Sequence, residues 1–358
     1  MIDAGAFATL LCEWCLDVRR RDYVLVFTTP LAAPLIRALH RALITRGAWA
    51  PGLRIAIPGV AEDFYRLAPD ELLDEFPPQD LAEMERIDAY LRIDAPENTR
   101  TLAEIDPAAI ARVSRARSPI QEVRLGKRWC GTLWPTSALA QEAGMSDDDY
   151  AAFVNRALFL DRPDPVAAWR ELSDRQQAIV DRLTQAREIR IEADGTDLRL
   201  RIDGRTWINS NGLRNMPSGE VFTGPLEDSA NGTIRFTLPS NPRGVSVEGV
   251  ELTFENGKVT KATADRGQRY LDAALATDPG ARFLGELGIG TNFGIDRPTG
   301  SILLDEKIGG TVHLALGRSY PETGGTNASA LHWDLICDLR NGGRLTADGE
   351  PVALAGTP

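Results

Sequence analysis

The chain has 358 residues, of which 43% are hydrophobic and 25% are charged. This length exceeds what a single hydrophobic core usually serves and predicts two domains, and the composition excludes wholesale disorder. The formal net charge of −11 disfavours nucleic acid as a partner, because an acidic protein repels the phosphate backbone.

The sequence shows no sign of secretion or of membrane insertion. Met1–Phe7 lacks a basic stretch leading into an apolar run, and no segment approaches the roughly 18 apolar residues of a spanning helix. We therefore expect a cytoplasmic protein without a membrane partner. In that compartment four cysteines predict no disulfide framework. Cys12 and Cys15 form a C-x-x-C, but they lie on an apolar helical face, which predicts a structural role.

The first part of the chain alternates strand-like and helix-like segments. The predicted elements are strands at 23–27, 53–57 and 89–93 and a helix at 31–45. In that helix Leu35, Leu39 and Leu43 share one face. Strand, helix and strand in succession predict a parallel sheet of the Rossmann-like kind. No G-x-G-x-x-G follows the first strand, so no dinucleotide is expected.

Two helices are predicted in the middle of the chain. Ser146 is a candidate N-cap, and three aspartates follow it, where carboxylates suit the positive end of the helix dipole. A second, long helix follows Pro165 and places Trp169 and Leu172 on its buried side.

From about residue 188 the hydrophobic pattern changes to a period of two. Asp194-Gly195 and Asn256-Gly257 each separate two alternating runs, which predicts β-hairpins. We therefore expect an N-terminal Rossmann-like parallel α/β domain with a helical connector at 1–187. A C-terminal β-rich α+β domain is expected at 188–358.

Two of the three histidines, His313 and His332, lie in strand-like runs of the second domain. His332 and Asp334 are two residues apart, so a strand places both side chains on one face. Such a pair can hold a divalent cation, or it can be a hydrogen-bonded pair that supports the fold. The third histidine, His40, lies in the first predicted helix and is expected to be a surface or satisfied residue.

Glu220 and Glu286 each stand alone in glycine-rich, apolar segments. Burying an unpaired carboxylate costs several kcal/mol or more, so each needs a partner, and a metal ion is a natural one. The glycines at 285, 288 and 290 indicate either a loop that brings the backbone close to the ions or plain turns. Two imidazoles and three carboxylates without a thiolate suit one or two divalent cations such as zinc, cobalt, manganese or magnesium.

Three ordered segments carry a resemblance to a known family. Residues 215–222 read Asn-Met-Pro-Ser-Gly-Glu-Val-Phe, residues 313–321 read His-Leu-Ala-Leu-Gly-Arg-Ser-Tyr-Pro, and residues 332–334 read His-Trp-Asp. Weaker similarity extends over most of the chain. The sequence resembles the bacterial aminopeptidase T and aminopeptidase S family of dinuclear metallopeptidases.

The resemblance implies a role for each conspicuous residue. The implied metal ligands are Glu220, Glu286, His313, His332 and Asp334, with Glu286 or Asp334 bridging two divalent ions. Glu306 is implied as general base or ligand, and Tyr320 as a catalytic tyrosine. The stretch between Glu306 and His313 is two residues longer than in the best-known members, so Asp305 is the alternative acid.

The implied activity is a metallo-aminopeptidase acting on peptides with a free N-terminus. The two ions lower the pKa of a water from about 15.7 towards 7. Glu306 takes a proton from that water and later passes one to the leaving amine, and Tyr320 donates a hydrogen bond to the developing oxyanion. The family also implies a homodimer in which the first domain shapes access to the site.

Two other functions compete with this interpretation. An iron-dependent ring-cleaving dioxygenase of the same fold keeps a His-x-Asp pair but lacks the Gly-Glu of the first glutamate segment, so Glu220 and Glu286 favour the hydrolase. A non-catalytic metal-binding protein has no need of Glu306 and Tyr320. The sequence specifies neither the preferred N-terminal residue nor the native metal.

Overall fold

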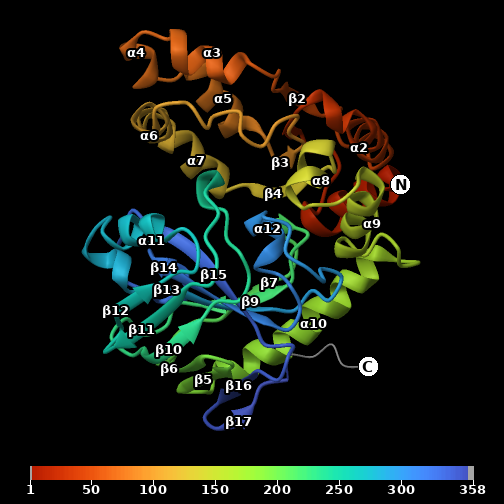
Figure 1. Ribbon diagram of the computed structural model, residues 1–358. Helices are drawn as coiled ribbons and strands as arrows, with labels where there is room; N and C mark the ends of the chain where they lie inside the picture. Colours follow the sequence, from red (N-terminus) through yellow and green to blue (C-terminus); the bar gives the residue numbers. More distant parts are fainter. Residues whose placement is uncertain (1, 354–358) are drawn as a thin grey trace. The chain divides into compact units, whose positions relative to one another are not determined.

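The computed structural model describes residues 2–353, and the chain divides into two compact units (Figure 1). Unit 1 comprises Met1–Ala167 and Gly212–Met216, and unit 2 comprises Ala168–Asn211 and Pro217–Pro358. The chain thus enters unit 2, returns to unit 1 for five residues, and re-enters unit 2 just before Glu220. The expected domain boundary at residue 188, which is the first residue of a strand, stays a prediction.

Unit 1 is built on a parallel sheet. Its strands are β1 (Val24–Thr28), β2 (Gly52–Ile55), β3 (Ala89–Asp94), β4 (Arg128–Leu133) and β8 (Asn215–Met216), in the order β2-β1-β3-β4-β8. Its α-helices are α1 (Ala4–Leu10), α2 (Ala33–Thr45), α3 (Val60–Leu67), α4 (Asp70–Leu73), α5 (Pro78–Arg86), α6 (Pro107–Ala116), α7 (Ser118–Leu125), α8 (Ser137–Glu142) and α9 (Asp147–Ala157). A π-helix, η1 (Leu11–Cys15), and a 3₁₀-helix, η2 (Pro30–Ala32), complete the unit.

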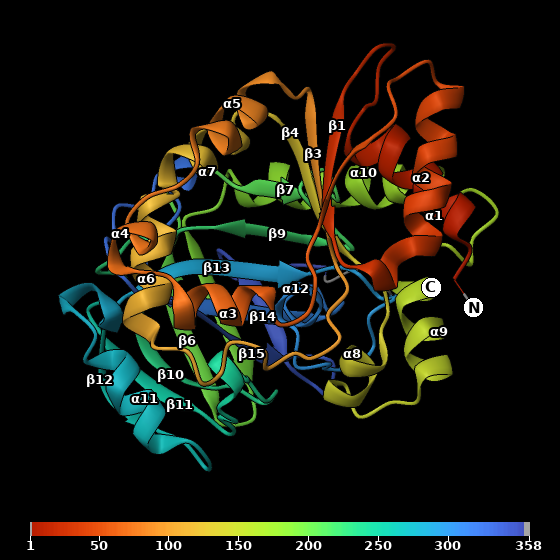
Figure 2. The same ribbon diagram turned by 90° about the horizontal axis from the view of Figure 1, so that it is seen from above.

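The predicted β-α-β unit is confirmed. β1 pairs in parallel with β2 and with β3, and Figure 2 shows β1 beside β3. Leu35, Leu39 and Leu43 form the buried face of α2. Parallel neighbours need a crossover connection, which the amphipathic helix α2 supplies between β1 and β2. The short strand β8 was not predicted; there the N–H of Gly131 donates to the carbonyl of Arg214 at 2.7 Å.

The C-x-x-C segment is helical and buried, but its winding is that of a π-helix. All four cysteines are buried and free. Burial raises the pKa of Cys12 to about 11, so its thiol stays protonated at neutral pH. A protonated thiol is a poor nucleophile and metal ligand, in line with the structural role predicted.

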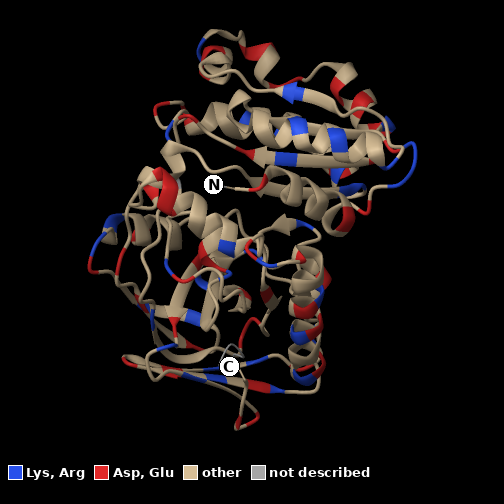
Figure 3. Cartoon of the chain, turned by 90° about the vertical axis from the view of Figure 1, so that its right-hand side faces the viewer, with Lys and Arg blue, Asp and Glu red and all other residues tan. Residues whose placement is uncertain are grey.

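Helix α10 (Pro165–Leu183) leads into unit 2. Basic and acidic positions are interspersed along it, as Figure 3 shows. Upstream, the predicted cap is confirmed: the Ser146 hydroxyl accepts from the N–H of Asp149 at 3.1 Å. Within residues 2–353 no helix has both the length and the apolar character needed to cross a bilayer.

Unit 2 contains two sheets. The larger consists of β5 (Glu188–Ala193), β6 (Thr196–Arg201), β10 (Asn231–Arg235), β11 (Glu251–Glu255), β12 (Lys258–Thr263), β16 (Arg344–Ala347) and β17 (Glu350–Pro351). The smaller has the order β15-β14-β13-β9-β7 and consists of β7 (Ile208–Ser210), β9 (Glu220–Thr223), β13 (Leu284–Gly290), β14 (Thr311–Gly317) and β15 (His332–Asp338). Helices α11 (Gln268–Leu275) and α12 (Ile302–Asp305) and three 3₁₀ turns, Pro242–Gly244, Pro279–Arg282 and Pro321–Thr323, connect the strands.

One hydrophobic core serves both sheets of unit 2. Leu198, Ile234 and Leu252 of the larger sheet belong to the same buried cluster as Leu287 and Val312 of the smaller one. Both predicted hairpins are confirmed, since Ala193 pairs with Thr196 and Glu255 with Lys258 across their turns. The smaller sheet thereby gains a rigid apolar support on which polar residues can be held in place.

The loop or turn interpretation of the glycines at 285, 288 and 290 is wrong. All three lie in β13, in which every residue is buried. A Cβ at Gly285 would lie 2.3 Å from the carbonyl oxygen of Arg318, and one at Gly290 would lie 2.0 Å from that of Ile308. These glycines are needed because neighbouring backbone packs directly against the strand.

Candidate metal centre

The sequence-predicted ligands come from four adjacent elements of the smaller sheet. Glu220 begins β9, Glu286 lies in β13, His313 lies in β14, and His332 and Asp334 lie in β15. Strand pairing sets Gly290 opposite Glu220 and Gly288 opposite His313. Residues separated by as many as 114 positions in the sequence therefore meet through the register of antiparallel strands.

The potential ligand atoms form three overlapping groups, in each of which all atoms lie within 4.8 Å of one another. The groups are Glu220, Glu286 and His313; Glu286, His332 and Asp334; and Glu306, His313 and Asp334. Glu286 belongs to the first and second groups, and Asp334 belongs to the second and third. Either carboxylate is therefore placed to be shared between two ions.

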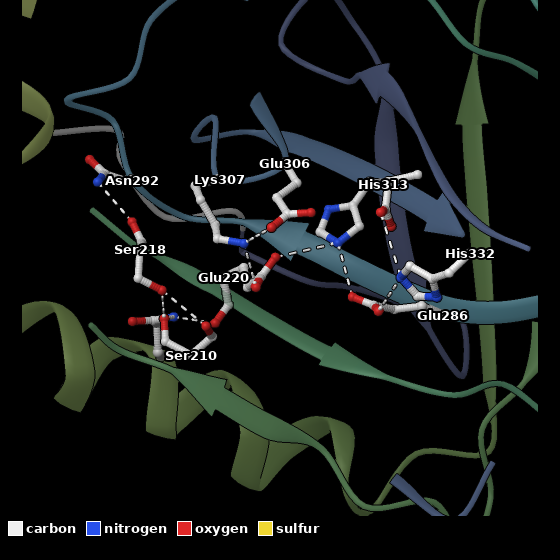
Figure 4. Close-up of polar contacts among 11 residues, drawn as sticks. Ser210, Ser218, Glu220, Glu286, Asn292, Glu306, Lys307, His313 and His332 are labelled. Carbon is white, nitrogen blue, oxygen red and sulfur yellow. Dashed lines mark hydrogen bonds and ion pairs between the residues drawn. The ribbon is translucent and has the colours of Figure 1, made fainter. Parts of the chain in front are cut away.

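Each histidine directs Nε2 towards carboxylates. His313 Nε2 lies 3.3 Å from Glu286 Oε1 and 3.4 Å from Glu220 Oε2 (Figure 4). His332 Nε2 lies 3.6 Å from Glu286 Oε2 and 3.6 Å from Asp334 Oδ2. The two oxygens of Glu286 therefore face two different imidazoles. The predicted common face of His332 and Asp334 is confirmed by their contact.

The orientation of both rings has a local cause. His332 Nδ1 lies 2.8 Å from the carbonyl oxygen of Arg318, which can only accept, so Nδ1 is the donor and Nε2 is the nitrogen that faces the carboxylates. The His313 ring lies against Gly288 of the neighbouring strand, where a Cβ would come within 2.0 Å of Nε2. The absence of a side chain at position 288 makes room for the imidazole.

A buried polar network holds the segment that carries Glu220. The Gln176 side chain, from α10, donates to the carbonyl oxygens of Ser210 and Glu220. The Asn292 amide donates to the carbonyl of Ser218 at 2.9 Å. Gly219 has φ +117°, a conformation that favours glycine, and a Cβ there would lie 2.6 Å from that of Asn292. The backbone conformation and the close contact with Asn292 explain why a glycine precedes Glu220.

The structure separates the two candidate acids. The Asp305 carboxylate accepts from the N–H and hydroxyl of Thr299 at 2.7 and 2.8 Å and from the N–H of Gly300 at 2.9 Å. It is therefore occupied in closing its own loop. Glu306 instead brings a carboxylate oxygen into the group with His313 and Asp334. Of the two, Glu306 is the acid that faces the centre.

Tyr320 lies beside the centre. Its ring packs edge-on against His332 and Phe222, with centroid distances of 5.1 and 5.8 Å. Burial, with the charge of Glu286 nearby, raises the pKa of the Tyr320 phenol above its ordinary value. The phenol therefore stays protonated and able to donate a hydrogen bond.

Sequence reasoning gave Lys307 no ligand or catalytic role, but the structure places it in the centre. Its ammonium group donates to Glu220 and to Glu306, and its side chain is fully buried. The available signal was a lysine directly after a candidate catalytic glutamate in the Asp-Glu-Lys run. The position next to Glu306 in the sequence did not show that the lysine side chain would point into the centre.

The residues present fit divalent cations. Glu220 Oε2, Asp334 Oδ1 and His313 Nδ1 are buried without a hydrogen-bond partner. Burial raises the pKa of Glu220 and of Asp334 to about 7. For His313, burial lowers the pKa, but Glu286 and Glu220 outweigh it and raise the value to about 9. Crowded, poorly satisfied carboxylates of this kind are relieved by a cation, and oxygen and imidazole donors suit hard or borderline divalent ions.

Comparisons with known proteins identify the family of the chain. The family model described as thermophilic metalloprotease (M29) matches residues 3–356. The chain is 32% identical to aminopeptidase 2 of Geobacillus stearothermophilus, over 91% of this chain and 90% of that protein. It is 26% identical to aminopeptidase AmpS of Bacillus subtilis (strain 168), over 97% and 96%.

A solved structure shares the fold. Wild-type AmpT from Thermus thermophilus superposes with a TM-score of 0.83 and 23% sequence identity, covering 98% of this chain and 96% of that one. The resemblance seen in the motif segments is thereby confirmed over nearly the whole length. The chain belongs to the M29 family of thermophilic metalloproteases.

Proposed function

We propose that this metallo-aminopeptidase removes the first residue of peptides with a free N-terminus, using a pair of divalent ions held in the candidate metal centre. Family membership and similarity to named aminopeptidases support the activity. The observation that carries the two-ion proposal is the sharing of Glu286, whose oxygens lie 3.3 and 3.6 Å from two different histidines.

Two sets of residues that share Glu286 would hold the ions. Glu220, Glu286 and His313 would hold one ion, and Glu286, His332 and Asp334 would hold the other. When bound, the ions supply a Lewis acid and bring the pKa of a water towards 7. Zinc, cobalt, manganese and magnesium all suit this donor set.

The chain's own groups perform the proton transfers. Glu306, next to the shared group, accepts a proton from the attacking water and returns one to the leaving amine, a contribution of roughly 10²–10⁴-fold. The protonated Tyr320 donates a hydrogen bond to the carbonyl oxygen as negative charge develops there. The free α-amine of the substrate would coordinate an ion or pair with a carboxylate of the centre, which would limit cleavage to the first residue.

We also propose a cytoplasmic homodimer. Exposed apolar side chains on unit 1 support the dimer, because Trp49, Ile57, Val60 and Leu67 are 58%, 54%, 59% and 77% exposed, and association would remove apolar surface of this kind from water. Light scattering coupled to size-exclusion chromatography gives the mass directly; a monomer at micromolar concentration would refute the dimer.

Metal removal and replacement test the activity. The protein is stripped with a chelator and titrated with each metal, and turnover is measured on a panel of aminoacyl chromogenic amides and on their N-acetylated counterparts. We expect activity to disappear on stripping, to return as two ions bind, and to be absent on blocked substrates. Glu286→Gln should abolish turnover, while Glu322→Gln, at an exposed position, should not.

The same experiment decides between the rival functions. No turnover with any metal would support a non-catalytic metal-binding protein. One iron per chain with oxygen uptake would support a ring-cleaving dioxygenase. The presence of Glu220 and Glu286 in the same ligand group favours the hydrolase.

A further inference from the structure

Lys307 lies at the inner end of the metal centre. Its side chain is 0% exposed, and Nζ lies 2.7 Å from Glu220 Oε1 and in contact with Glu306 Oε1 (Figure 4). It follows Glu306 in the chain, just after α12. A buried ammonium group is costly unless it is paired, and both of its partners belong to the centre.

This contact divides the two oxygens of Glu220 between different tasks. Oε1 is engaged by Lys307, whereas Oε2 faces His313 Nε2 at 3.4 Å and has no hydrogen-bond donor. The lysine thus fixes the rotation of the carboxylate so that a single oxygen points towards the histidine. A carboxylate fixed in this way is prepared to be a ligand through one oxygen.

The negative charge of the centre favours an ammonium group beside it. Four carboxylates, from Glu220, Glu286, Glu306 and Asp334, belong to the ligand groups. Lys307 Nζ donates to Glu220 and to Glu306, so its ammonium group offsets negative charge on two of these four groups at once.

We propose that Lys307 is a positioning residue that joins the metal ligand Glu220 to the proposed base Glu306 and holds both in the arrangement that binds metal. This inference rests on the proposed function for the roles of the two glutamates. The opposite possibility is that Lys307 is a competing cation, which occupies Glu220 until a metal displaces it. The two differ in the sign of the change in metal affinity when the lysine is removed.

The first test is metal titration of Lys307→Met by calorimetry, starting from the stripped protein. We expect the affinity of the ion held by Glu220 to fall about 10–100-fold, the range found for outer partners of metal ligands. Lys261→Met is the matched control, because Lys261 is an exposed lysine on β12 of the same unit, and it should bind as the wild type does. Unchanged or tighter binding by Lys307→Met would overturn the proposal.

If Lys307→Met does not fold, a double variant that keeps the net charge unchanged replaces it in the test. Glu306→Gln with Lys307→Met removes one negative and one positive charge, and it is compared with Glu306→Gln alone. We expect the double variant to bind metal at least about tenfold more weakly and to show a smaller rise in Tm on metal addition. Equal affinity of the two would count against the positioning role.

These readouts separate this inference from the proposed function. If the wild type binds two ions but cleaves no peptide, the peptidase proposal fails while the affinity comparison still judges Lys307. If the wild type is active and Lys307→Met binds metal as tightly as it does, only the role of Lys307 fails.

Discussion

The Gly288→Ala substitution would place a methyl group where the imidazole of His313 now lies. A Cβ at position 288 would come within 2.0 Å of His313 Nε2 and 2.1 Å of Cε1. The two residues face each other on paired strands, and His313 is fully buried. Since neither backbone can retreat without breaking the sheet, the ring must leave its place.

Displacement of the His313 ring should lower both the stability of the fold and its affinity for metal. Overpacking a buried site typically costs about 1–3 kcal/mol, so the metal-free variant should fold with a lowered Tm. His313 would also leave Glu286 and Glu220, now 3.3 and 3.4 Å from Nε2. Loss of a ligand should reduce metal affinity by more than the roughly 10–100-fold caused by losing an outer partner.

Thermal denaturation and metal titration measure the two effects separately. Gly131→Ala is the matched control, because Gly131 is also a strand glycine but the nearest atom to a Cβ there is 3.4 Å away. Its metal affinity should equal that of the wild type. If Gly288→Ala bound two ions with wild-type affinity, the assignment of His313 as a ligand would be refuted.

Two further predictions concern the support of the centre and its protons. Gln176→Leu should lower the free energy of unfolding by about 1–3 kcal/mol, because it removes the two hydrogen bonds that the buried amide donates to the carbonyls of Ser210 and Glu220; urea denaturation checks this, with the exposed Gln177→Leu as control. The second prediction concerns the stability of the metal-free protein as pH changes. The pKa is raised to about 7 for Glu220 and Asp334 and to about 9 for His313, so folding favours the protonated form of each group. Their stabilisation is present at low pH and is lost as pH rises through those values, and for His313 the displacement from 6.5 corresponds to roughly 3 kcal/mol. The Tm in chelator should fall from pH 5 to pH 9; a rise over that range would contradict the cause given for these pKa values.

Features of the fold that depend on neighbouring residues were predictable from the sequence. The cap at Ser146, the Asp194-Gly195 hairpin and the buried face of α2 each result from turn chemistry or periodicity within a few residues. The return of 212–216 to unit 1 was not predictable, because β8 pairs with β4 through only two residues and no local pattern encodes such a contact.

The candidate site shows the same distinction. The common face of His332 and Asp334 follows from the strand period, and the isolated glutamates were conspicuous by their apolar surroundings. The glycines of β13 were mistaken for turn residues, because a glycine that admits a ring or a backbone looks the same in sequence as one that bends the chain. The choice of Glu306 over Asp305 also required coordinates, since it depends on hydrogen bonds that Thr299 makes with Asp305.

The centre is a place where the metal-free fold carries unfavourable interactions. Carboxylate oxygens of Glu220 and Asp334 are buried without donors, and their protons are retained up to about pH 7. Binding of cations replaces those protons, so part of the binding free energy is stability that the folded chain lacks without them. The rigid strands and the core beneath them keep the carboxylates together against their repulsion. A softer scaffold would let them separate, and the ligands would no longer be in place when a metal arrives.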